Sequence, residues 1–250
     1  MLAIVVVSGE FAFSTSLESQ SSCSKFLRRY LKQYEQAASA LPEYIGQTDL
    51  SGPALIDLFS VNPKIYRLFN SDAGVNGELT IREHSLRVLK IFDTNLERGE
   101  LKATRVSDGV RVASVMRAAL ALHDIGKPLA ILAGDKALQH QFTIPILQRE
   151  MRRVGFNQKE IALAKALVEG EVIGQLLQKM ISIEQAEFVL KQYAARVEMS
   201  PDDFFSLKAA FYIADAGSYH TLRDKVFQEI NGTLVPRDPI FSQLKARMKI

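Results

Sequence analysis

The sequence predicts an all-α fold, and three observations lead to that prediction. Helix start signals recur along the chain, apolar residues recur three and four positions apart, and alternating strand patterns are nearly absent after residue 10. The composition is that of a globular protein, since 47% of the 250 residues are hydrophobic and 24% are charged. A chain of this length can bury a sizeable core without disulfides or a structural metal.

The N-terminal part is the least regular. Residues 1–15 are interpreted as a small strand or a packed terminal arm. A helix is expected over residues 24–40, and one or two helices are expected between Leu55 and Phe69. The segment 70–77 is rich in Asn, Asp, Ser and Gly, so it is the best candidate for a domain boundary.

From residue 80 to about residue 220, helices are expected to follow one another with short loops. A capping box pairs Ser, Thr or Asn with a Glu or Gln three residues later, and the two side chains satisfy each other's free backbone N–H groups. Ser200 followed by Pro201 offers a helix N-cap and a proline at the first helical position. Capping boxes begin at Thr80, Asn157 and Ser182.

Composition also limits the functional classes. The single cysteine, Cys23, rules out an intrachain disulfide framework and a four-cysteine zinc site, and it fits a reducing compartment. A net charge of +3 from interspersed residues is compatible with a phosphate-bearing ligand, but it does not indicate a nucleic-acid-binding groove. The sequence shows neither a signal peptide nor a run of about 18 apolar residues. We therefore expect a cytoplasmic protein without a membrane partner.

Three of the predicted helices carry His or Asp on an apolar face: His84 on the first, His123 on the second and Asp215 on the third. A lone buried histidine is usually a satisfied core residue, but a carboxylate facing a core needs a pair, a proton or a metal. Two imidazoles and two carboxylates converging on one point would make a mixed nitrogen–oxygen metal site. Adjacent helical residues diverge by about 100°, so His123 and Asp124 can share an ion only near a helix end, which Gly126 predicts.

At these positions the sequence resembles the HD-domain superfamily of metal-dependent phosphohydrolases. The family order is His…His-Asp…Asp, and the resemblance covers about residues 78–222 and implies the HD-domain helical bundle. The matching segments are Glu83-His84-Ser85-Leu86-Arg87-Val88, His123-Asp124-Ile125-Gly126-Lys127-Pro128 and Ala214-Asp215-Ala216-Gly217-Ser218.

Carried over by position, the resemblance implies that one divalent cation (Mn, Mg, Fe, Ni, Co or Zn) activates a water for attack on phosphorus. The ligands would be His84, His123, Asp124 and Asp215. It also divides the chain into an N-terminal helical extension that can pack on the core, the HD domain and a C-terminal tail. These segments are residues 1–77, 78–222 and 223–250.

Two further residues are implied to be catalytic. In relatives with the same motif, the lysine at the position of Lys127 contacts the substrate phosphate; the alternative is a cation that favours the C-terminal end of a helix dipole. His140 is similar to a further histidine that lies near the metal in some relatives, as a second-metal ligand or a proton donor. Two-metal members carry another histidine after this point, and residues 141–219 contain none. Glu169 or Glu171 is a candidate oxygen substitute for that histidine, but a single metal is favoured.

The leading functional hypothesis is a phosphohydrolase that acts on a nucleotide or another small phosphate ester. The Glu-Asp pair of (p)ppGpp hydrolases and the Tyr-Pro signature of cyclic-di-GMP phosphodiesterases are both missing. One alternative is an HD-fold module that binds a nucleotide or a partner with little or no catalysis. Another is a purely structural helical protein, and no oligomeric state is implied. Candidate phosphate contacts are Arg82, Arg87, Arg149, Arg152 and Arg153.

Overall fold

The structure is a computed structural model with two compact units, Met1–Ala40 and Leu41–Ile250. In the first unit, strands β1 (Val6–Val7) and β2 (Glu10–Phe11) pair antiparallel, within the segment predicted to form a strand or an arm. The helix predicted over residues 24–40 lies outside the described residues. The described residues are 6–7, 10–11, 41–47, 49–74, 79–97, 110–230 and 232–249.

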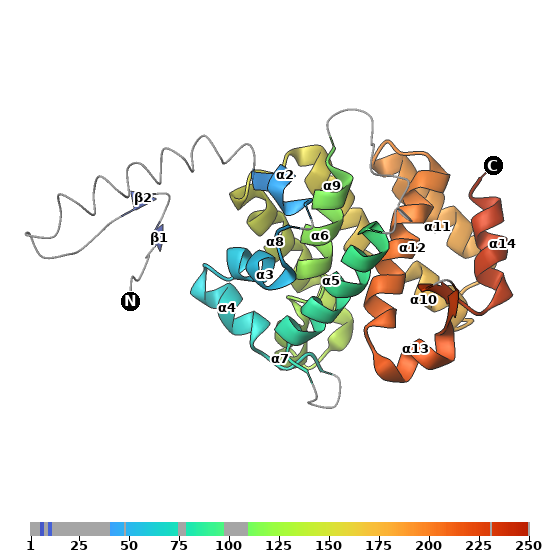
Figure 1. The fold of residues 1–250 in the computed structure, drawn as a ribbon, viewed down its shortest axis with the longest axis horizontal. Coiled ribbons are helices and arrows are strands. Elements are labelled where there is room, and N and C mark those ends of the chain that lie inside the picture. Colours follow the sequence, from blue (N-terminus) through green and yellow to red (C-terminus); the bar gives the residue numbers. More distant parts are fainter. Residues whose placement is uncertain are drawn as a thin grey trace, which may run out of the picture. The chain divides into compact units, whose positions relative to one another are not determined.

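The second unit is helical, which confirms the predicted all-α fold (Figure 1). Helices α3 and α4 occupy the segment in which one or two helices were expected. Within the described residues, no helix has the length and apolar character needed to span a membrane. The elements are α2 (Leu41–Ile45), α3 (Gly52–Phe59), α4 (Pro63–Phe69), α5 (Ile81–Glu97), α6 (Val112–Leu122), α7 (Lys127–Leu132), the 3₁₀ helix η2 (Lys136–Leu138), α8 (Gln139–Arg153), α9 (Gln158–Val168), α10 (Val172–Leu177), α11 (Ile183–Arg196), α12 (Pro201–Gly217), α13 (His220–Val226), β3 (Phe227–Ile230), β4 (Thr233–Pro236) and α14 (Pro239–Arg247).

The predicted helix starts are formed by local hydrogen bonds. Thr80 N donates to Glu83 Oε2 at 2.8 Å, and Glu83 N donates back to Thr80 Oγ1 at 3.2 Å. The same reciprocal exchange begins α9 and α11. Ser200 caps α12, with Pro201 in its first turn. These helices therefore begin where the capping signals predict, because each signal satisfies its own backbone N–H groups.

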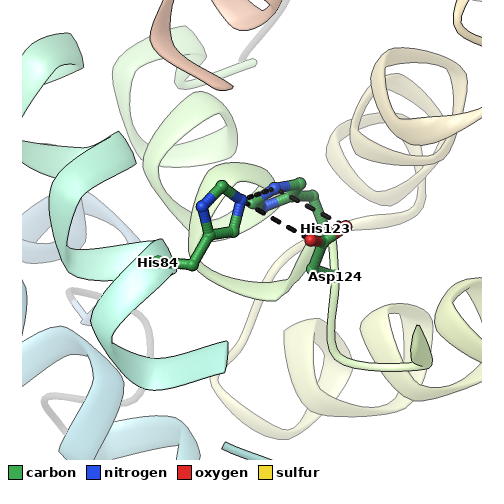
Figure 2. Close-up of side chains that lie close together, drawn as sticks. All are labelled: His84, His123 and Asp124. Atoms are coloured by element: carbon green, nitrogen blue, oxygen red, sulfur yellow. Dashed lines mark hydrogen bonds and ion pairs between the residues drawn. The ribbon is translucent and has the colours of Figure 1, made fainter. Parts of the chain in front are cut away.

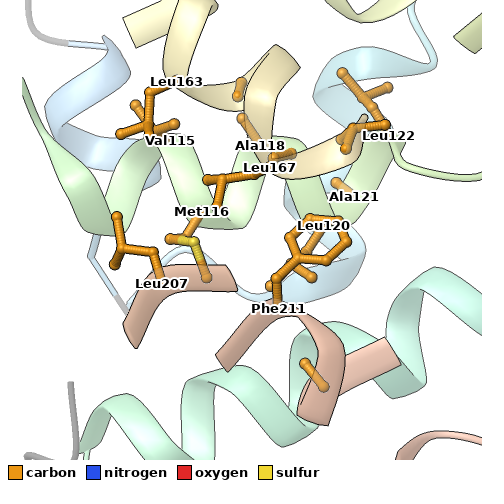
Figure 3. Packing of buried hydrophobic residues seen from close by; sticks show 14 of the residues in the cluster. Val115, Met116, Ala118, Leu120, Ala121, Leu122, Leu163, Leu167, Leu207 and Phe211 are labelled. Carbon is orange, nitrogen blue, oxygen red and sulfur yellow. The ribbon is translucent and has the colours of Figure 1, made fainter. Parts of the chain in front are cut away.

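Helix α6 lies at the centre of the second unit and packs against α2, α5, α9 and α12 (Figure 1). Ten of its eleven residues are buried, which explains why its sequence is apolar on nearly every face. Figure 3 shows Val115 and Met116 of this helix among Leu163 of α9 and Leu207 and Phe211 of α12. The residues that follow the C-terminal end of α6 therefore lie in the interior of the protein.

The two terminal parts of this unit share its core. Phe59 and Phe69 of the predicted extension are fully buried in the same cluster as Leu244 of the predicted tail. The tail also contains a hairpin that the sequence analysis did not predict, in which β3 and β4 pair antiparallel with Phe227 opposite Pro236. The boundaries at residues 77 and 222 stay predictions; residue 222 lies within α13, and residues before 77 and after 222 share one core.

Candidate metal centre

His84 is held inside the core by α5. Its side chain is fully buried, as are Ile81 and Val88 on the same face, so its predicted inward orientation is confirmed. The next residue, Ser85, donates its hydroxyl to Ala121 O of α6 at 3.1 Å. This bond ties α5 to α6 close to the point where α6 ends.

His123 and Asp124 lie in the turn between α6 and α7, which is the helix end that the sequence predicts. Gly126 is needed there because the turn lies against α8: a Cβ on Gly126 would stand 2.3 Å from Thr143 N. Gly126 N donates to Thr143 Oγ1 at 3.1 Å, which fixes the contact. Since the chain leaves the helix here, the two adjacent side chains can point toward one place.

The four predicted ligands converge. His84 Nε2 lies 3.1 Å from His123 Nε2, and Asp215 Oδ1 lies 3.2 Å from the first nitrogen and 3.3 Å from the second. Asp124 Oδ2 lies 3.5 Å from His84 Nε2. Figure 2 shows the side chains of His84, His123 and Asp124 turned toward one another. Neighbouring ligand atoms at about 2.1 Å from one ion stand about 3.0 to 3.4 Å apart, so the spacing of the two nitrogens and Asp215 Oδ1 fits a single divalent cation, with Asp124 slightly farther away.

Hydrogen bonds fix the tautomers of both histidines. His123 Nδ1 lies 2.7 Å from Leu120 O, which can only accept, so Nδ1 carries the ring proton. Ser218 Oγ donates to Asp215 O at 2.7 Å, so it accepts from His84 Nδ1 at 3.2 Å. In the neutral form of both rings, Nε2 therefore carries the lone pair and faces the same point, as in histidine ligands of metals. Two nitrogens and buried carboxylate oxygens meet there, and a positive charge is needed between them.

The pKa values reflect this excess of acceptors. Burial lowers the pKa of His123, but the charges of Asp124 and Asp215 raise it to about 9. Burial raises the pKa of Asp215, but the charge and hydrogen bond of His123 lower it well below its ordinary value. The Asp215 side chain is 34% exposed, yet its Oδ1 atom is buried and faces the Nε2 atoms of His84 and His123. A proton on His123 supplies the positive charge in the ion-free protein, in the position that suits a cation.

Asp124 is oriented by two further side chains. Gln139 Nε2 donates to Asp124 Oδ1 at 2.6 Å, and Lys127 Nζ donates to Asp124 Oδ2 at 3.1 Å. Lys127 is the first residue of α7, so its charge lies beside the carboxylate and not at the C-terminal end of a helix. Although burial raises the pKa of Asp124, the charges of His123 and Lys127 lower it. Partners of this kind orient a metal-ligating carboxylate.

A cavity of about 350 Å³ adjoins the ligands. Both predicted catalytic residues, Lys127 and His140, line it. His140 Nδ1 is buried and has no hydrogen-bond partner in the described part of the chain. Burial lowers the pKa of His140, while the nearby Glu171 raises it. The remaining wall is formed by Gln139, Val168, Gly170, Glu171, Ile173, Gly174, Leu177, Gln178, Lys208, Phe211, Tyr212, Ala216, Tyr219, Leu222 and Val226, together with the ligands His123, Asp124 and Asp215.

Most of the other residues predicted to contact the metal or the phosphate do not line this cavity. Glu169 pairs with Arg196 at 2.7 Å and is not part of the wall, whereas Glu171 is. Arg82 pairs with Asp57 on α3 at 2.8 Å. In the part of the chain that the structure describes, none of the five arginines proposed as phosphate contacts lines this cavity. The candidate cations for an anionic ligand are therefore lysines.

Sequence reasoning missed four polar residues of the site: Gln139, Lys208, Ser218 and Tyr219. Tyr219 stacks on His84, with ring centroids 4.6 Å apart and an interplanar angle of 28°, and its hydroxyl lies 3.2 Å from His84 Nε2. Burial raises its pKa, and Asp124 raises it further, so the hydroxyl stays protonated. A local signal existed for Ser218 and Tyr219, because both follow the predicted ligand on α12 within about one helical turn.

Comparisons of this chain with protein-family models, with curated proteins and with solved structures found no match. The resemblance to the HD-domain superfamily is therefore carried by the motif residues themselves. The site itself consists of two histidines with fixed tautomers, two carboxylates and an adjoining cavity that is lined by lysines.

Proposed function

We propose that this protein is a divalent-metal-dependent phosphohydrolase of the HD type, acting on a nucleotide or another small phosphate ester. The observation that carries the proposal is the convergence of His84 Nε2, His123 Nε2 and carboxylate oxygens of Asp124 and Asp215. Their order along the chain is His…His-Asp…Asp, as in the HD motif. A ligand set of two nitrogens and two oxygens suits Mn, Fe, Ni, Co or Mg, and Zn is also compatible.

The residues around the ligands support hydrolysis at phosphorus. When bound, a divalent cation supplies an activated water and polarises the phosphoryl group. Lys127, held beside Asp124, offers a compact cation to a phosphate oxygen. His140 lines the same cavity, with a pKa lowered by burial and an unpartnered buried Nδ1, which suits a group that exchanges a proton with a leaving group.

The substrate class and cellular location belong to the same proposal. A cavity of about 350 Å³ lies in the size range of small-ligand sites and suits a ligand of mononucleotide size better than a nucleic-acid strand. One cation per chain is proposed, because the ligands converge on one point. A cytoplasmic location is proposed because the single cysteine fits a reducing compartment.

The proposal is tested by hydrolysis assays on protein stripped of metal and reloaded in turn with Mn, Mg, Ni and Co. We expect turnover of generic phosphomonoesters or phosphodiesters, and of nucleotides, with at least one of these ions. Asp124→Ala should lose this activity. His220→Ala is the matched control, because His220 is exposed and lies outside the site. Absence of turnover with every ion, or full activity in Asp124→Ala, would contradict the proposal, and tight nucleotide binding without turnover would favour a regulatory module.

A further inference from the structure

Lys208 is a buried cation on the wall of the cavity that adjoins the candidate metal centre. It lies on α12, seven residues before Asp215, so two helical turns place both residues on the same face. Its relative exposure is only 5%. Neither the HD motif nor the sequence pattern singles it out, and the roles proposed above do not use it.

The hydrogen bonds of Lys208 leave one donor for a ligand. Lys208 Nζ donates to Leu167 O and, at 3.0 Å, to Glu169 O, where α9 ends. An ammonium group has three N–H donors. In the described part of the chain, these two carbonyl oxygens are the hydrogen-bond acceptors of Nζ. The third donor has no hydrogen-bond acceptor there, and Nζ lies 5.6 Å from the ring centroid of Phe211, another residue of the cavity wall.

The two hydrogen bonds to carbonyl oxygens at the end of α9 do not by themselves explain why a lysine is buried here. A buried ammonium is unfavourable unless it is paired, and burial lowers the pKa of Lys208 to about 7 although Glu171, Asp215 and Glu169 raise it. A neutral donor could satisfy the same two carbonyls without that penalty. The charged group is better explained by an anion that enters the cavity.

The charges around the cavity also favour an anionic ligand. One divalent ion and Lys127 would together balance the carboxylates of Asp124, Asp215 and Glu171, which leaves no net attraction for an anion. Lys208 in its protonated form changes this balance to a net positive charge. Since Lys127 comes from the start of α7 and Lys208 from α12, a ligand held between them contacts two separate elements.

We propose that Lys208 is a second anion-binding residue of this cavity, and that its third N–H donates to an oxygen of a phosphoryl group held beside the metal centre. This inference rests on the proposed function for the position of the metal ion. It adds a specificity-determining contact: the ligand has to bring a tetrahedral oxyanion to Lys208 as well as to Lys127.

The test is calorimetric binding of inorganic phosphate to the full chain, with and without Mn²⁺, so no turnover is required. Lys208→Met should weaken phosphate binding at least about tenfold, while its Mn²⁺ affinity stays within about twofold of the wild-type value. Lys208→Gln, whose amide can still donate to the carbonyls of Leu167 and Glu169, should show the same loss and guards against misfolding of the first variant. Lys191→Met, which removes a surface lysine paired with Glu187 at 2.9 Å, is the matched control and should bind phosphate normally.

Unchanged phosphate affinity in folded Lys208→Met or Lys208→Gln would overturn the inference. It would also be overturned if the wild-type protein bound no phosphate in either condition. Phosphate binding that depends on Lys208 without hydrolysis of any ester would support this inference and contradict the proposed function instead, so the two failures are distinguishable.

Discussion

The Arg117 cluster and the candidate metal centre both bury charged side chains in one helical core, but their charges are balanced differently. Arg117 lies on α6 and is fully buried. Its guanidinium donates to the carbonyl oxygens of Ile45, Gln47 and Leu50. Its Nε also lies 2.9 Å from Asp93 Oδ1 on α5. The charge of Arg117 is matched here by the Asp93 carboxylate and by backbone carbonyl oxygens, so no ligand is needed to balance it.

The metal centre lies at the C-terminal end of the same helix, where α5 and α12 add ligands, and it has the opposite composition. His84 and His123 both turn Nε2 acceptors inward, and Asp124 and Asp215 add carboxylate oxygens. Folding brings these acceptors together without a fixed cation between them. Removing one partner of a buried, paired charge is strongly destabilising, whereas an excess of converging acceptors favours the binding of a cation.

The largest effect is expected for Arg117→Met. Removing the guanidinium takes the partner from Asp93 and from three buried carbonyls, so the free energy of unfolding should fall by roughly 3–5 kcal/mol. Urea denaturation of the metal-free protein measures this change. The Mn²⁺ affinity of the folded fraction should stay within about twofold.

His84→Gln should show the reverse pattern, with a small change in unfolding free energy and loss of Mn²⁺ binding. The comparison between the two clusters would fail if Arg117→Met were as stable as the wild-type protein, or if both variants lost stability equally.

An intermediate effect on stability is expected from Lys208, a buried cation whose charge is only partly balanced by nearby carboxylates. Its pKa is lowered to about 7 by burial, although Glu171, Asp215 and Glu169 raise it, and His140 faces the same cavity. Between pH 7 and the ordinary lysine pKa near 10.5, the unfolded chain binds more protons than the folded chain, so stability rises with pH.

In the presence of a chelator, the wild-type protein should therefore gain about 2 kcal/mol relative to Lys208→Met between pH 7 and pH 9. Denaturation of both proteins at a series of pH values measures the difference, in which the titration of other groups largely cancels. Parallel pH profiles would show that the ammonium of Lys208 is not destabilised in the folded state.

The smallest effect is expected for Gln139→Leu. This change removes the 2.6 Å hydrogen bond to Asp124 Oδ1, while Lys127 still holds the other oxygen. Mn²⁺ affinity should weaken about tenfold, because the carboxylate loses one of the two partners that orient it. Gln178→Leu, elsewhere on the wall of the cavity, is the control. Equal Mn²⁺ affinities in the two variants would show that Gln139 does not orient Asp124.

The fold was predictable where its causes are local. The Thr80 capping box satisfies its own helix end, so its signal can be read from four consecutive residues. The β3–β4 hairpin was missed because its first strand has one buried residue, Phe227, followed by three exposed ones, which leaves no alternating pattern. The Asn231-Gly232 pair between these strands is a hairpin signal, and it falls in the segment predicted to be a C-terminal tail.

The site divides in the same way. His84, His123 and Asp215 were visible because polar residues on apolar helix faces break a pattern. Lys208 was not visible, because the carbonyl oxygens that hold it belong to Leu167 and Glu169, far away in the sequence. Residues that support a site through tertiary contacts have the same sequence neighbourhood as ordinary surface polar residues.

The most direct test of the central claim is a calorimetric titration of metal-free protein with Mn²⁺. We predict saturable binding of one ion per chain, abolished in His84→Gln and in Asp215→Asn and retained in His220→Gln. Absence of saturable binding by the wild-type protein, or equal binding by all four proteins, would contradict the claim that these buried acceptors form a metal site.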